Sequence, residues 1–264
     1  MSDMINQNYL LNDQYKDASN FSLRLHALRR MGAMQRSWYR WIFDHIELAS
    51  DGAVLELGCG PGFLWLENIE RVPSTWRVTL SDFSSGMLQD ARTNLGEKAQ
   101  DFTFEVIDAQ AIPYPDAYFD VIIANAMLYH VPDLARALAE VSRVLKPGGR
   151  FYATSIGDTA VLSLSQLMHQ IIPDSWLSSS LGFSIENGKE QIARWFSRVE
   201  LDRVEKHMTV GDRETLMELA RSGLSKEDQQ DPAKLLPVEE AIDQLLARQG
   251  KIHFNMDFGL FSAR

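Results

Sequence analysis

Cysteine and long apolar runs are what this chain most clearly lacks. It has one cysteine in 264 residues, which excludes an internal disulfide and a zinc or iron–sulfur centre held mainly by cysteines. It has no uninterrupted run of about 18 apolar residues, the length that a membrane-spanning helix needs. The start, MSDMINQNYL, has no basic segment followed by an apolar one, so no secretory signal is expected. We therefore expect a cytoplasmic protein without a membrane partner.

Positive charge is also scarce. The 26 lysines and arginines face 36 aspartates and glutamates, which gives a formal net charge of −10. This balance disfavours binding to nucleic acids and to anionic membranes, because both carry dense negative charge. The apolar fraction of 45% is ordinary for a globular protein. No feature of the sequence indicates an oligomeric state.

Short apolar runs alternate with amphipathic segments in the first two thirds of the chain. Strands are predicted over residues 53–57, 77–81, 102–107, 119–125 and 150–155. Helices are predicted over residues 63–71, 85–95 and 134–145, with Ser84 as the cap of the second. This alternation with short connections is typical of an α/β fold with a doubly wound parallel sheet.

The flanking regions follow other patterns. Residues 1–20 are polar and predicted to be mobile at the start, whereas residues 21–48 carry apolar side chains at helical spacing. The arginines of this region (Arg24, Arg29, Arg30, Arg36 and Arg40) are interpreted as a solvated helix face. After the fifth strand, helices are predicted over 158–172, 190–196, 213–222 and 237–249, strands over 198–208 and 251–263, and a loop over 178–188.

We expect a single domain. It comprises N-terminal cap helices (1–50), a ligand-binding core (51–158), a lid insertion (159–197) and C-terminal strands and helices (198–264). The lid and cap surround the core, and they carry no recognisable motif.

A glycine-rich turn follows the first strand directly, in the segment VLELGCGPG. Glycines in such a turn permit positive φ and a close approach of the backbone to a ligand. A dinucleotide site requires G-x-G-x-x-G, but here Gly58, Gly60 and Gly62 are followed by Phe63 at the position of the third glycine. The carboxylate of Glu56 at the strand end is unfavourable beside a pyrophosphate and favourable beside an ammonium or sulfonium. The loop therefore favours a nucleoside ligand that carries positive charge.

Acidic residues follow three successive strands. Glu56 ends the first, Asp82 the second and Asp108 the third. Asp82 is placed to accept hydrogen bonds from ribose hydroxyls, Asp108 from an exocyclic amino group of adenine, and Phe83 to pack on the base. Each acid has a structural alternative: Glu56 as a brace of the loop through backbone amides, Asp82 as a helix cap, and Asp108 as a turn residue.

Four motifs in order, ELGCGPG, LSDFS, IDAQAIPYPDAYFDVIIAN and EVSRVLKPGGRF, resemble those of class I S-adenosylmethionine-dependent methyltransferases. The closest resemblance is to the small-molecule branch with a type 11-like domain, and it covers residues 53–155. It implies a Rossmann-like sheet of seven strands whose last strand, 251–263, is antiparallel, and S-adenosylmethionine as the cofactor. It also implies that Glu56 and the glycine loop hold the methionine part of the cofactor.

The resemblance further implies that Asp82 binds the ribose, that Asp108 and Ala109 bind the adenine, and that the backbone of Asn125 and Ala126 lies near the methionine ammonium. The predicted cofactor-binding residues are Tyr15, Glu56, Gly58, Cys59, Gly60, Gly62, Asp82, Phe83, Met87, Asp108, Ala109, Asn125 and Ala126. Cys59 is interpreted as a packing residue of the loop rather than a nucleophile, because no histidine adjoins it in the sequence.

Methyl transfer from a sulfonium is an in-line displacement, in which positioning alone can contribute about 7–11 kcal/mol. A base is needed only for an acceptor that is protonated at the working pH. His130 is the candidate base or acceptor-orienting residue, because histidine titrates near neutrality. The predicted contacts of a small-molecule acceptor are Trp38, Tyr129, His130, His169 and Trp176.

The acceptor atom stays open among oxygen, nitrogen, carbon and sulfur. The other histidines show no metal-ligand spacing, so no metal is expected. Three alternatives also stay open: a cyclase or lyase of the same fold that uses S-adenosylmethionine differently, an NAD(P)-dependent oxidoreductase, and a non-catalytic cofactor-binding protein.

Overall fold

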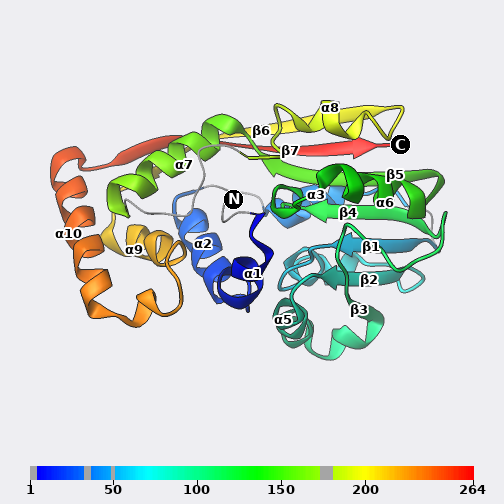
Figure 1. The fold of residues 1–264 in the computed structure, drawn as a ribbon, viewed down its shortest axis with the longest axis horizontal. Helices are drawn as coiled ribbons and strands as arrows, with labels where there is room; N and C mark the ends of the chain where they lie inside the picture. Colours follow the sequence, from blue (N-terminus) through cyan, green and yellow to red (C-terminus); the bar gives the residue numbers. More distant parts are fainter. Residues whose placement is uncertain (1–4, 33–36, 49–50, 173–180) are drawn as a thin grey trace.

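The fold is built on one mixed sheet of seven strands flanked by helices (Figure 1). The structure, a computed structural model, describes residues 5–32, 37–48, 51–172 and 181–264. The strands are β1 (Ala53–Leu57), β2 (Arg77–Asp82), β3 (Phe102–Val106), β4 (Phe119–Asn125), β5 (Leu145–Ile156), β6 (Val199–Val210) and β7 (Ile252–Ala263).

The strand order is β3-β2-β1-β4-β5-β7-β6, and β1 to β5 run parallel. β7 is antiparallel to both of its neighbours, β5 and β6. This confirms the predicted α/β sheet with an antiparallel last strand. The chain order reverses at β1, which lies between β2 and β4, and open α/β sheets bind their ligands at such a switch point.

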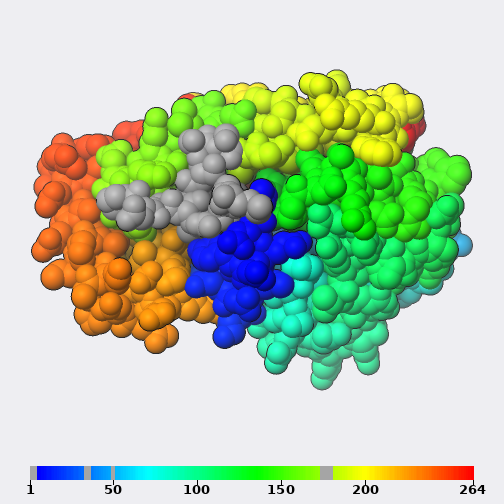
Figure 2. All heavy atoms as spheres, viewed as in Figure 1, coloured from blue at the N-terminus to red at the C-terminus, as the bar shows by residue number. Residues whose placement is uncertain are grey.

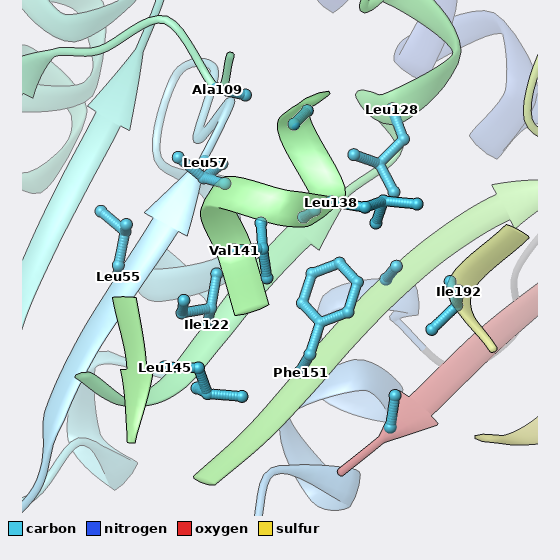
Figure 3. Packing of buried hydrophobic residues seen from close by; sticks show 14 of the residues in the cluster. Leu55, Leu57, Ala109, Ile122, Leu128, Leu138, Val141, Leu145, Phe151 and Ile192 are labelled. Atoms are coloured by element: carbon cyan, nitrogen blue, oxygen red, sulfur yellow. The ribbon is translucent and has the colours of Figure 1, made fainter. Parts of the chain in front are cut away.

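Strand residues alternate between two buried faces. In β4, Ile122 and Ala124 belong to one apolar cluster, whereas Val121 and Ile123 belong to the other. The first cluster is covered by α6 (Leu134–Val144), whose Val141 lies beside Ile122 in Figure 3. The second is covered by α3 (Trp38–His45), α4 (Phe63–Leu66) and α5 (Ser85–Leu95). Burial on both faces explains why these strands are almost entirely apolar in sequence.

Some boundaries differ from the prediction. The helix predicted over 63–71 is divided into α4 and a 3-10 turn at Ile69–Arg71. The helix predicted to end at residue 145 ends at Val144, because Leu145 already pairs with Phe119 in the sheet. The segment Pro147-Gly148-Gly149 is accommodated by a register shift between β4 and β5, so β5 begins five residues earlier than predicted.

A second group of helices packs on the far half of the paired strands β6 and β7. It consists of α2 (Ser19–Arg30), α7 (Asp158–Ile171), α9 (Arg213–Arg221) and α10 (Pro232–Gln249). α10 begins five residues before the predicted start, because Asp231 caps it by accepting from the backbone N–H of Ala233 and Pro232 occupies its first turn. The short helix α8 (Gly188–Ile192) packs on the sheet instead.

The N-terminal segment is described from residue 5 onward, and the start of the chain, which is predicted to be mobile, lies outside the described residues. The described part forms α1 (Gln7–Tyr9) and a π-helical turn at Leu10–Gln14. The backbone N–H of Ala18 donates to Asp90 Oδ2 at 2.7 Å, and the Lys16 carbonyl lies so near Gly86 that a Cβ there would be 1.9 Å away. In Figure 2 this segment (blue) lies between the core and the orange helices. Within the described ranges, no helix is long and apolar enough to cross a membrane.

The helical region predicted over 21–48 contains two separate helices. Gly32, with φ of 83°, follows the end of α2. Ser37 then caps α3 by accepting from the backbone N–H of Arg40. A left-handed glycine is a common helix stop, and serine a preferred helix start.

Candidate active site

A cavity of about 290 Å³ lies where the carboxyl ends of the central strands meet the N-terminal segment. The predicted cofactor residues that line it are Tyr15, Gly58, Cys59, Gly60, Asp82, Phe83, Met87, Asp108, Ala109, Asn125 and Ala126. The predicted acceptor residues that line it are Trp38, Tyr129 and His130. Residues from distant parts of the sequence therefore meet at one site.

The glycine loop forms one wall of this cavity. Gly58, Gly60 and Gly62 have φ values of 65°, 54° and 75°. A Cβ on Gly58 would lie 2.7 Å from the Cβ of Met127, so this position excludes any side chain. Gly62 does not line the cavity: it packs on α5, where a Cβ would lie 3.2 Å from that of Ala91. Positive φ and close packing together explain the glycines.

Asp82 is fixed at the cavity by backbone donors. Its Oδ2 accepts from the N–H of Gly60 at 2.9 Å, and its Oδ1 accepts from the N–H of Ser84 at 2.8 Å. Burial raises the pKa of Asp82 to about 6, although these backbone hydrogen bonds oppose the increase. Each carboxylate oxygen can accept further hydrogen bonds. Ser84 caps α5 as predicted, by accepting from the N–H of Met87.

Glu56 is buried and is not among the residues that line the cavity. Its side chain is 1% exposed, and its Oε2 accepts from the indole Nε1 of Trp65 at 2.5 Å. Burial raises the pKa of Glu56 to about 8, and the negative charge of Asp82 adds to the increase, whereas the hydrogen bond from Trp65 opposes it. Glu56 therefore braces the loop through the side chain of Trp65, and its contact with the methionine part of the cofactor stays a prediction.

Asp108 combines a turn role with a place at the cavity. Its Oδ1 accepts from the backbone N–H of Gln110 at 2.9 Å and from the side chain of Gln110 at 3.0 Å. Gln110 also lines the cavity, and its Oε1 accepts from the backbone N–H of Asp133. Gln110 is not predictable as a site residue, because a glutamine after a strand carries no distinctive signal.

The end of β4 is held by a small polar network. Asn125 Oδ1 accepts from Thr154 Oγ1 at 2.7 Å and from the indole of Trp38 at 3.4 Å. Thr154 Oγ1 in turn accepts from the backbone N–H of Ala126 at 2.9 Å, and Ala126 has φ of 53°. A positive φ at a non-glycine residue is strained, and such strain is common at functional sites. Since the N–H of Ala126 is engaged, its carbonyl is the group available to a ligand.

Tyr15 and His130 are in direct contact. The Tyr15 hydroxyl lies 2.9 Å from His130 Nε2, and the two rings meet edge-on with centroids 5.1 Å apart. Tyr15 follows the π-helical turn, and His130 ends the 3-10 turn Leu128–His130 after β4. The ring of Tyr129 lies against that of His130, with centroids 4.5 Å apart, and burial raises the pKa of the Tyr129 hydroxyl. A residue predicted to bind the cofactor thus meets the candidate base.

Two other predictions for the site have different outcomes. His169 lies on the exposed side of α7, where its Nδ1 is 2.7 Å from the Ser165 carbonyl, and it does not line the cavity. Val161 and Leu164 are the residues of α7 that do. Trp176 lies outside the described residues.

Cys59 is buried, and burial raises its pKa, which agrees with a packing role. The described part of the chain holds no group of three or more residues suited to a metal ion.

The remaining wall of the cavity is mostly apolar and was not predicted. Its residues are Leu10, Leu11, Phe21, Leu25, Leu28, Ile156, Val161, Leu164, Leu181, Met256 and Phe258, together with Gln7 and Arg24. Helical spacing identifies an apolar face on α2, but it does not say which element that face meets. Only the tertiary structure could assign these residues to the site.

Residues 55–153 match the family model described as a methyltransferase domain. The match identifies residues 55–153 as similar to a methyltransferase domain. The finding confirms the resemblance of the four sequence motifs. The chain is 35% identical over 136 residues to the ubiquinone/menaquinone biosynthesis C-methyltransferase UbiE of Francisella philomiragia. The aligned residues make up 51% of this chain and 54% of that protein. The chain thus spans about half the length of the curated relatives that it matches.

Solved structures share the methyltransferase fold. Phosphoethanolamine N-methyltransferase 2 of Haemonchus contortus, in complex with S-adenosyl-L-methionine, superposes with a TM-score of 0.60 at 20% identity, over 97% of this chain and 59% of that chain. The [4+2]-cyclase SpnF superposes with a TM-score of 0.58 at 20% identity, over 92% of this chain and 93% of that chain. At such identities the likeness concerns the fold of the methyltransferase domain.

The buried Glu56 makes stability depend on pH. Its pKa in the folded protein, about 8, lies above the ordinary 4.5, so folding keeps a proton that the unfolded chain loses. Its contribution is complete below pH 4.5 and is lost as the pH rises towards 8. We expect Glu56→Gln, which still accepts from the indole of Trp65, to reduce this loss by roughly 1–3 kcal/mol between pH 5.5 and 8.

Urea unfolding of the unliganded protein at several pH values measures this effect. The exposed Glu97→Gln is the matched control and should unfold with the pH dependence of the natural protein. If Glu56→Gln lost as much stability as the natural protein over this range, Glu56 would be ionised in the folded state throughout.

Proposed function

We propose that the protein transfers a methyl group from S-adenosylmethionine to a small, largely apolar acceptor. The observation that carries the proposal is the convergence of the glycine loop, Asp82, Asp108 and Asn125 on one cavity, which Tyr15 and His130 also line. The cavity thus combines groups suited to a nucleoside with a Tyr–His pair among apolar side chains.

The residues present fit this cofactor. Asp82 already accepts two backbone N–H bonds and keeps lone pairs for hydroxyl donors such as those of a ribose. Asp108 and Ala109 follow β3, while Phe83 and Met87 offer apolar surface for a flat base. When bound, S-adenosylmethionine supplies an electrophilic methyl group on a cationic sulfur.

The chain's own residues then position the acceptor. Leu25, Leu28, Val161 and Leu164 exclude water around an apolar molecule, which keeps its reacting atom in place. His130 accepts a proton from the acceptor, and its hydrogen bond to the Tyr15 hydroxyl fixes the orientation of the imidazole. In this role Tyr15 acts through His130 rather than on the acceptor itself.

Two comparisons bear on the acceptor and on the type of reaction. UbiE acts as a C-methyltransferase in the biosynthesis of ubiquinone and menaquinone, and an apolar acceptor of this kind is compatible with the apolar wall. The fold of SpnF, however, serves a cyclase. Since one fold supports different reactions, the product decides between them.

The test begins with binding. Isothermal titration should show that S-adenosylhomocysteine binds the protein at least about tenfold more tightly than NAD. Incubation with methyl-labelled S-adenosylmethionine and a panel of phenols, hydroxyquinones, amines and thiols should then transfer label to at least one class, with S-adenosylhomocysteine as coproduct. Release of methylthioadenosine would instead indicate cleavage or cyclisation of the cofactor. Equal affinity for NAD and S-adenosylhomocysteine would refute the proposal.

A further inference from the structure

Gln110 uses both ends of its side-chain amide. Its Nε2 donates to Asp108 Oδ1 at 3.0 Å and to Asp108 Oδ2 at 3.2 Å. Its Oε1 accepts from the backbone N–H of Asp133 at 3.0 Å, directly before α6. A rotated amide would turn its carbonyl towards the carboxylate and its amino group towards an N–H, so these partners fix one orientation. Gln110 therefore holds the acid that follows β3 against the start of α6.

The same hydrogen bonds determine how Asp108 can accept a further donor. An ionised carboxylate has about two acceptor sites on each oxygen. Within the described ranges, Oδ1 of Asp108 accepts from the backbone N–H of Gln110 at 2.9 Å and from its side chain, whereas Oδ2 accepts from that side chain alone. Oδ2 thus keeps the more open acceptor site, on a residue that lines the cavity.

This arrangement selects for a donor on the ligand. An ionised carboxylate accepts hydrogen bonds and donates none. An amino group at Oδ2 is therefore favoured, whereas a carbonyl oxygen in the same place would leave two acceptors facing each other without a proton. Adenine carries an amino group where hypoxanthine carries a carbonyl, so this contact distinguishes two bases of nearly equal shape.

We propose that Gln110 is a positioning residue that sets the base selectivity of the cavity. By donating to both oxygens of Asp108 it fixes the plane of the carboxylate, and its bond to the backbone of Asp133 anchors this arrangement on α6. Gln110 acts through Asp108 and needs no contact of its own with the base. The inference rests on the proposed function, because it takes the adenine of S-adenosylmethionine as the ligand of Asp108.

Gln110→Glu tests the donor directly. The variant keeps an acceptor for the N–H of Asp133, but it places a second carboxylate within hydrogen-bond distance of Asp108. Two carboxylates so close resist the loss of their last shared proton. At low pH the protonated pair still supplies a donor in place of the amide, whereas at high pH two negative charges repel each other. The variant should therefore lose affinity for an adenine ligand as the pH rises.

The experiment compares the natural protein with Gln110→Ala, Gln110→Glu and the matched controls Gln100→Ala and Gln100→Glu, all as full chains. Gln100 is exposed and does not line the cavity. Isothermal titration uses S-adenosylhomocysteine and S-inosylhomocysteine, in which a carbonyl replaces the amino group of the base. Thermal unfolding verifies that the variants are folded.

Titrations at about pH 5.5 and about pH 8.5 bracket the loss of the shared proton. Each variant is compared with the natural protein at the same pH. This comparison cancels the contributions of the other charged or titratable groups nearby, which are Tyr15, Arg24, Tyr39, Cys59, Asp82, Tyr129, His130 and Asp133.

We expect the natural protein to prefer S-adenosylhomocysteine to S-inosylhomocysteine by at least about tenfold. Gln110→Ala should reduce this preference at least about threefold, because Asp108 can then turn away from the base. Gln110→Glu should lose about tenfold in affinity for S-adenosylhomocysteine, relative to the natural protein, between the lower and the higher pH. The Gln100 variants should change neither quantity.

An unchanged preference in Gln110→Ala, or an affinity of Gln110→Glu that follows the natural protein at both pH values, would overturn the proposal and leave the proposed function standing. Equal affinity of the natural protein for the two ligands would also overturn it. If the natural protein bound neither ligand, the proposed function would be refuted, and this role of Gln110 with it.

Discussion

Gly58→Ala should destabilise the protein by roughly 2–4 kcal/mol and weaken the binding of S-adenosylhomocysteine at least about 100-fold. A side chain at a φ of 65° costs about 1 kcal/mol or more by itself. In addition, the new Cβ would lie 2.7 Å from the Cβ of Met127, an atom next to the backbone that cannot easily move. Relief of this clash must displace either the glycine loop or the segment after β4, and both line the cavity.

The matched control separates backbone strain from the clash. Gly96 has φ of 56°, no atom lies within 4 Å of its would-be Cβ, and it does not line the cavity. Gly96→Ala should therefore show the cost of backbone strain alone, about 1–3 kcal/mol at a φ of 56° and a ψ of −131°, with the affinity unchanged. Differential scanning calorimetry and isothermal titration measure both effects. Equal losses in the two variants would mean that the close approach to Met127 has no role in the site.

His130→Gln should lower kcat by about 10²–10⁴-fold with the best acceptor of the labelling panel, the usual contribution of a general base. Glutamine can still hydrogen-bond to the Tyr15 hydroxyl, but it cannot take up a proton. The affinity for S-adenosylhomocysteine should change by less than about threefold. Single-turnover kinetics with labelled cofactor measures the methyl-transfer step directly.

Tyr15→Phe distinguishes orientation from proton transfer. It removes the 2.9 Å contact with His130 but leaves the imidazole, so kcat should decrease less than in His130→Gln, and the pH profile of kcat should keep its acidic limb. In His130→Gln that limb should disappear. If His130→Gln had a normal kcat, His130 would have a packing role only. The acceptor atom would then react in its deprotonated form without a base.

The position of the proposed nucleoside-binding residues at one cavity was largely predictable from the sequence. Each of them belongs to a strand and the turn that directly follows: the glycine loop after β1, Asp82 after β2, Asp108 after β3 and Asn125 at the end of β4. Parallel strands bring their carboxyl ends to one edge, so the order of these short motifs determines their arrangement in space. The same local logic predicted the doubly wound parallel sheet, whereas the resemblance to methyltransferases implied seven strands and the direction of the last one.

Even there, the direction of a side chain was not determined locally. The sequence places Glu56 correctly on β1. Its hydrogen bond with Trp65 depends on how α4, the helix after the loop, packs against β1, and the sequence alone does not show this packing. His169 illustrates the same limit on α7, where its side chain bonds back to its own helix.

What the sequence by itself determined is therefore the placement of the proposed cofactor-binding residues, because local strand-to-turn units carry them. What only the tertiary structure decided is the wall that we propose for the acceptor. Tyr15 meets His130 across 115 positions of sequence, and Arg24 faces the cavity while Arg29 faces solvent. Such contacts depend on how helices rotate and dock on distant elements, and packing of the apolar faces fixes that rotation only when the whole chain has folded.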